Sequence, residues 1–167
     1  MIFLILLFIF GSDTSTDEQN TLINDFNKYQ STYYEDLIKL GDLEDQWNKN
    51  KDESDSYTSQ GFITKLADTG NEYADTYEYY LQHQQDYSNF LDTNKQQLEL
   101  LEISSGKVSV IDIKKEIGDN KIRIQQNIRM MQTSIQQAIE ISQAQEESKN
   151  LDLSSLVQLG IKLIGLL

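Results

Sequence analysis

The stretch that decides the fold is "ITKLADTGNEYADTYEYYLQHQQDYSNFLDTNKQQLELL", Ile63 to Leu101. Its apolar and aromatic residues recur at alternating steps of three and four. A sustained repeat of 3.5 residues is typical of a helix that packs along other helices. The stretch therefore predicts one helix over about 60–103, with these seam positions: Ile63, Leu66, Gly70, Tyr73, Tyr77, Tyr80, Gln84, Tyr87, Leu91, Asn94, Leu98 and Leu101.

Two further stripes of the same kind lie on either side of this helix. The first predicts a helix from about residue 17 to the early fifties, with Leu22, Phe26, Tyr29, Tyr33, Leu37, Leu40 and Trp47 on one face. The second follows a turn at Ser104–Ser109, where Ser109 can cap a third helix through Asp112. Its apolar face contains Ile113, Ile117, Ile124, Ile128, Met131, Ile135, Ala138 and Ile139.

These stripes predict an all-α fold, an elongated antiparallel three-helix bundle or coiled coil with an apolar C-terminal helix. The short turns make neighbouring helices antiparallel, and this direction brings the tyrosines of the first helix to those of the second. An alternative is a β-hairpin at about 107–125 within an otherwise helical protein, because this segment alternates locally around Gly118–Asp119. The absence of proline from all 167 residues suits long uninterrupted helices.

The two ends of the chain differ from its middle. Residues 1–12 begin with "MIFLILLFIF", an apolar run that is too short to span a bilayer and is interpreted as a signal peptide or an apolar anchor. Residues 13–149 form the acidic helical bundle. Residues 150–167 are predicted as an apolar helix that docks on the bundle, self-associates or meets lipid. The candidate membrane or oligomer contacts in this helix are Leu156, Leu159, Leu163 and Leu166.

Composition excludes several classes of function. The net charge of −13 repels nucleic acid, so no nucleic-acid partner is expected. The chain has no cysteine and one histidine, which removes thiolate chemistry and multi-histidine metal sites. No phosphate loop, serine elbow or dinucleotide fingerprint is present. We therefore expect no enzyme, no cofactor, no metal site and no catalytic residue.

The tyrosines of "YEYYLQHQQDY", Tyr77 to Tyr87, have two interpretations. In the first, the tyrosines occupy positions that face the neighbouring helix, so their rings pack between the helices and their hydroxyls reach the edge of the interface. If they pack imperfectly, they line a ligand groove, whose candidate residues are Tyr29, Tyr33, Tyr77, Tyr80 and Gln84.

The function that the sequence favours is that of an exported structural or protein-interaction bundle, secreted or at the cell surface. Its expected partner is another protein or a second copy. One alternative is a small-molecule-sensing or carrier bundle that uses the tyrosine-lined groove. The other is a membrane-active protein that uses its C-terminal apolar helix.

Overall fold

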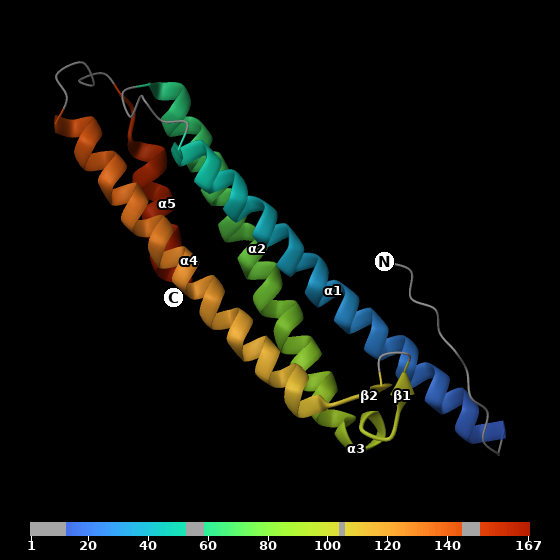
Figure 1. Cartoon of the computed structure of the whole chain (residues 1–167). Coiled ribbons are helices and arrows are strands. Elements are labelled where there is room, and N and C mark those ends of the chain that lie inside the picture. The colour runs from blue at the N-terminus through green and yellow to red at the C-terminus, as the bar shows by residue number, and fades with distance from the viewer. Residues whose placement is uncertain (1–12, 53–58, 104–105, 145–150) are drawn as a thin grey trace. The chain divides into compact units, whose positions relative to one another are not determined.

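The computed structural model describes residues 13–52, 59–103, 106–144 and 151–167, and these residues form an all-α bundle (Figure 1). The predicted fold class is thereby confirmed. The interpretation of residues 1–12 as a signal peptide or anchor lies outside the described residues. In chain order the elements are α1 (Asp13–Asp52), α2 (Gln60–Thr93), α3 (Lys95–Leu98), β1 (Glu102–Ile103), β2 (Gly106–Lys107), α4 (Val110–Ala144) and α5 (Ser154–Gly165).

The chain divides into two compact units, and α1, α2 and α4 each contribute a segment to both. The first unit comprises the described residues up to Glu35 together with Leu81–Asp119. The second comprises Asp36–Tyr80 and Asn120–Leu167, so it contains the whole of α5.

Aromatic rings join α1 to α2 in the first unit. Tyr33 lies 5.6 Å from Tyr87 between ring centroids, and Tyr29 stacks on Phe90 at 4.8 Å. Residue numbers fall along one helix as they rise along the other, so the two helices are antiparallel. The predicted meeting of tyrosines from the first and second helices is thus observed at Tyr33 and Tyr87.

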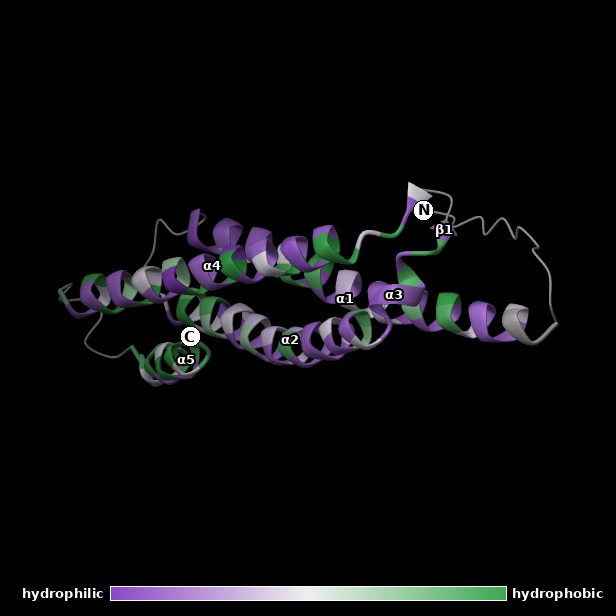
Figure 2. Ribbon diagram, turned by 90° about the horizontal axis from the view of Figure 1, so that it is seen from below, coloured by the Kyte–Doolittle hydropathy of each residue, from purple (hydrophilic) through white to green (hydrophobic). Residues whose placement is uncertain are grey.

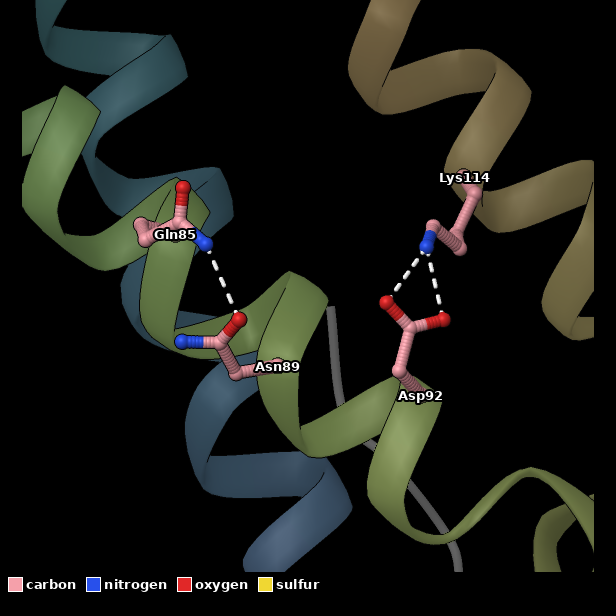
Figure 3. A network of polar contacts seen from close by, with 4 residues as sticks. All are labelled: Gln85, Asn89, Asp92 and Lys114. Atoms are coloured by element: carbon pink, nitrogen blue, oxygen red, sulfur yellow. Dashed lines mark hydrogen bonds and ion pairs between the residues drawn. The ribbon is translucent and has the colours of Figure 1, made fainter.

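Polar contacts on the surface of the first unit accompany this aromatic packing (Figure 3). Lys114 Nζ of α4 lies 2.6 Å from both carboxylate oxygens of Asp92 on α2. Within α2, Gln85 Nε2 donates to Asn89 Oδ1 at 2.9 Å. Exposed pairs of this kind contribute at most about 1 kcal/mol each, so the buried rings provide more of the stability of this unit.

The core of the second unit is drawn from all four of its helices. Trp47 of α1, Tyr77 of α2 and Ile128 of α4 are almost completely buried. Other buried apolar side chains of this unit lie on the stripes that the sequence predicts: Leu40, Ile63, Leu66, Tyr73, Tyr80, Ile124, Met131, Ile135 and Ala138. Four more are buried off those stripes: Leu43, Phe62, Ala67 and Ala74. Three leucines of α5 complete this core, as described below.

The second helix ends earlier than its repeat predicts. α2 stops at Thr93, and Asn94 Nδ2 donates to the carbonyl oxygen of Phe90 at 2.9 Å. An asparagine side chain that bonds its own backbone competes with helix propagation. The chain continues through the single turn of α3, and Leu98 and Leu101 stay buried. The prediction of one helix to residue 103 was wrong because the apolar spacing continues past Asn94, where a φ of −109° and a ψ of 14° depart from helical values.

The alternative β-hairpin at about 107–125 was also wrong. Val110–Ala144 is one helix, and the only strands among the described residues are the two-residue pair β1 and β2. Ser109 Oγ accepts a hydrogen bond from the backbone N–H of Asp112 at 3.3 Å, as the predicted cap requires. Gly118 lies exposed inside α4, while Ile117 and Ile124 are buried on the three-and-four stripe. The helical period therefore decides the structure here, and the local alternation does not.

Candidate functional site

The inner face of α5 docks on the second unit. Leu156, Leu159 and Leu163 recur at steps of three and four, and none of them is exposed. Gly70 of α2 provides the space for this docking, because a side chain at that position would overlap Leu159 and lie 2.9 Å from Trp47 Cζ3. The absence of a side chain at position 70 thus lets a leucine of α5 approach the α2 backbone closely.

Polar contacts fix both ends of α5 on α2. Near its start, Gln60 Nε2 donates to the Asp152 carbonyl at 3.2 Å, and the Asp152 N–H donates to Gln60 Oε1 at 2.9 Å. The Asp152 carboxylate accepts the Ser154 N–H at 2.9 Å, and this contact with Ser154 lowers the pKa of Asp152. Near the other end, Lys162 Nζ lies 2.6 Å from Asp75 Oδ1. The pairs follow one another in the same order along both helices, so α5 runs parallel to α2.

The outer face of α5 is apolar and exposed. Val157, Ile161 and Ile164 are 46%, 66% and 67% exposed, and Leu167, two residues beyond the end of α5, is 47% exposed. Figure 2 shows α5 nearly end-on, with much of its ribbon coloured hydrophobic. A helix with one apolar face against its own core normally presents polar residues to water. Because no other described part of the chain covers it, the outer face of α5 is the principal candidate site.

The candidate contact residues that the sequence indicates on this helix occupy a different side. Leu156, Leu159 and Leu163 are buried within the second unit, and Leu166 is half-buried. Their assignment to a membrane or oligomer contact stays a prediction. The exposed residues of α5 were not identified as a group from the sequence. The apolar run of this helix is nearly continuous, so the sequence does not show which side of the helix docks on the bundle.

The candidate groove residues are divided between the two units. Tyr77 and Tyr80 lie in the second unit, where their rings stack 5.9 Å apart and are fully buried. Tyr33 is buried in the first unit, where Tyr29 and Gln84 are half-buried. Of these five, Tyr29 borders a described cavity, whose volume is about 540 Å³. The tyrosine-lined groove as a whole stays a prediction.

The buried tyrosine hydroxyls have few good partners. Within the described residues, the hydroxyls of Tyr73 and Tyr77 make no hydrogen bond of normal geometry. Burial raises the pKa of both phenols, and the nearby amides of Asn127 and Gln125, respectively, offset only part of that rise. Phenols in this setting stay protonated and serve as packing groups, so they are poorly suited to acid–base chemistry near neutral pH.

A small polar cluster beside Tyr73 was not anticipated from the sequence. Asn127 Nδ2 donates to Glu44 Oε2, and Arg123 Nη1 lies 3.6 Å from the same oxygen. Burial raises the pKa of Glu44, and Arg123 opposes this effect. The position of Glu44 as a polar break in an otherwise apolar stripe was the available signal. Because its donors are already engaged within the cluster, we interpret the cluster as a structural contact between α1 and α4.

The described ranges contain neither a metal-binding cluster nor a membrane-spanning helix. No cluster of three or more His, Cys, Asp or Glu side chains that could hold a metal ion occurs in these ranges. Among the helices of the described residues, none combines the length and hydropathy needed to cross a membrane.

No family model, no curated protein and no solved structure matches the chain.

Proposed function

We propose that this chain is a structural or protein-interaction helical bundle that works at the cell surface or in the extracytoplasmic space, and that the outer face of α5 binds a second copy. The single observation that carries the proposal is this exposed apolar face on a helix that is already docked by its other face. Exposed apolar patches on a folded domain commonly mark interaction sites. The location outside the cytoplasm depends only on the sequence of residues 1–12.

The charge distribution favours a second copy at this face. The chain has a net charge of −13, so two copies repel each other over most of their surfaces. The only charged side chain within α5 is Lys162, and it is paired with Asp75 at 2.6 Å. Two copies that meet through the outer face of α5 bring no unpaired charge of α5 into the contact.

The spacing of the outer residues suits pairing between helices. Val157, Ile161 and Ile164 are separated by four and then three residues, which is the seam spacing of two packed helices. A two-fold contact uses the same patch on both copies, so an apolar stripe of this kind is complementary to itself. Because the stripe occupies only a 12-residue helix, the contact falls at the small end of the range for protein interfaces, and we expect reversible association.

The absence of cysteine from the chain allows a direct test. Ile161→Cys places one thiol in the middle of the proposed contact, and Ile38→Cys places one at a position of almost equal exposure on α1. Under mild oxidation, we expect Ile161→Cys to form disulfide-linked dimers much faster than Ile38→Cys. Equal rates for the two variants would contradict the proposed contact.

Lipid is the second candidate for the same face, because three exposed apolar side chains on α5, followed by the exposed Leu167, also suit an interfacial membrane segment. Such segments usually present several Lys or Arg residues beside the apolar face, whereas α5 has only the paired Lys162. Flotation with phosphatidylcholine vesicles distinguishes the two candidates. If the wild-type chain binds the vesicles and Ile161→Glu does not, lipid is favoured as the ligand of this face. If the wild-type chain does not bind the vesicles, the contact with a second copy is favoured.

A further inference from the structure

The first unit contains a groove between the N-terminal part of α1 and the segment where α2 passes into α3. It consists of two hollows of about 430 and 540 Å³. Both hollows are bordered by Glu18, Leu22 and Asn94, so they lie next to each other along the groove. All of its lining residues belong to the same unit.

One end of this groove combines an aromatic floor with an acidic rim. Tyr29 and Phe90 stack with ring centroids 4.8 Å apart, and both rings are half-buried, so part of each ring is accessible. The carboxylates of Asp17, Glu18 and Asp25 border the hollows, against the single ammonium group of Lys28. Accessible aromatic rings next to carboxylates attract cations through both the ring quadrupole and the negative charge.

The other end of the groove is apolar and has neutral hydrogen-bonding groups. Leu100 and Leu101 border the smaller hollow together with the side-chain amide of Gln97. Leu100 is 82% exposed, the highest value among the exposed large apolar side chains of the described residues. This end suits the aliphatic side chains and backbone of an extended segment, which a small free cation lacks.

We propose that this groove binds a cationic segment of a partner protein, with a lysine or arginine side chain against Tyr29 and Phe90 and an apolar neighbour against Leu22 and Leu100. Charge complementarity favours a positively charged partner, because the groove and the chain as a whole are both acidic. The site lies in the first unit and does not use α5, so this proposal goes beyond the proposed function and stands or falls separately from it.

The test uses the full chain and two capped synthetic peptides that differ only in charge. One peptide alternates lysine with leucine, and the other replaces each lysine by glutamate. Fluorescence anisotropy of a labelled peptide measures binding to the wild-type chain, to Tyr29→Leu and to Asp25→Asn. The matched controls are Tyr79→Leu, an exposed tyrosine in the other unit, and Asp119→Asn, which removes the same charge from α4 outside the groove.

We expect the lysine peptide to bind and the glutamate peptide to fail. Loss of a partly desolvated cation–aromatic contact in Tyr29→Leu should weaken binding by about three- to tenfold. Asp25→Asn should weaken it more than Asp119→Asn does, and Tyr79→Leu should leave it unchanged. Since Asp25 is exposed, its substitution reports on binding even if Tyr29→Leu reduces folding.

Three results would overturn the proposal. The first is no binding of the lysine peptide by the wild-type chain. The second is equal loss in Asp25→Asn and Asp119→Asn together with no effect of Tyr29→Leu, which would mean unspecific attraction to an acidic protein. The third is competition by free spermidine as strong as that of the peptide, which would identify a site for small cations and not for a protein segment.

Discussion

Gly70→Ala tests the docking of α5 most sharply, because the change adds one methyl group at a point of close approach. An alanine Cβ would overlap Leu159 and lie 2.9 Å from Trp47 Cζ3. Alanine in a helix interior is favoured over glycine by about 1 kcal/mol, whereas an extra methyl group in a packed core costs about 1–3 kcal/mol. We expect Gly70→Ala to lower the free energy of unfolding by up to about 2 kcal/mol.

The matched control is Gly118→Ala in α4, where an added Cβ meets no atom within 4 Å. This change should raise the free energy of unfolding by about 0.5–1 kcal/mol. The difference between the two variants, about 1–3 kcal/mol, measures the steric effect at Gly70 with the helix preference removed. Leu159→Ala should relieve the overlap. Gly70→Ala should therefore lower the free energy of unfolding less in the Leu159→Ala variant than in the wild-type chain.

Trp47, the only tryptophan of the chain, reports on the same contact. It is buried beside Gly70, so displacement of α5 should expose its indole and shift its emission to longer wavelength. Urea unfolding followed by this emission and by far-ultraviolet circular dichroism gives both the stability and the docking. The reasoning would be refuted if Gly70→Ala stabilised the protein as much as Gly118→Ala and left the emission unchanged.

Three other predictions concern polar groups. Tyr77→Phe removes a buried hydroxyl that makes no hydrogen bond of normal geometry within the described residues. Thermal unfolding should therefore show unchanged stability or a gain of up to about 1 kcal/mol. A loss above about 1 kcal/mol would mean that the hydroxyl does make a stabilising hydrogen bond. Glu44→Gln tests a carboxyl group whose pKa is raised above its ordinary value of 4.5 by burial. The protonated carboxyl group therefore stabilises the folded state of the wild-type chain below pH 4.5, and this stabilisation is lost as pH rises through the pKa of the folded state. The melting temperature of Glu44→Gln relative to wild type should therefore rise as pH increases above 4.5, and a fall would mean that the ion pair with Arg123 dominates. Tyr34→Phe removes a hydrogen bond of 2.7 Å that its hydroxyl donates to Glu116 at an exposed site, so urea titration should detect a loss of no more than about 1 kcal/mol.

The helices and most of the core could be predicted from the sequence because burial follows the three-and-four spacing closely. Tyr73, Tyr87 and Leu98 lie on the repeat of the second helix, and all three are buried in the structure. The end of α2 could not be predicted in this way. Spacing reports which side chains are apolar, while the end of α2 depends on the backbone of Asn94, whose φ of −109° and ψ of 14° depart from helical values.

The candidate sites were less accessible to sequence analysis because each depends on contacts between distant segments. The sequence places Gly70 on a seam, but only the structure shows that Leu159 uses the space above it. The outer face of α5 becomes visible only after its other face is seen to dock. In the groove of the first unit, Tyr29 was a candidate from the start, whereas its partner Phe90 lies off the predicted seam of the second helix.

The central claim is that the outer face of α5 joins two copies of the chain, and sedimentation equilibrium tests it most directly. The wild-type chain is compared with Ile161→Glu/Ile164→Glu and with Ile38→Glu/Ile122→Glu, which adds the same charge at exposed isoleucines of α1 and α4. We predict a mass that rises with concentration for the wild-type chain and the control, and a monomer at every concentration for the α5 variant. A wild-type monomer throughout, or equal association in all three proteins, would contradict the claim.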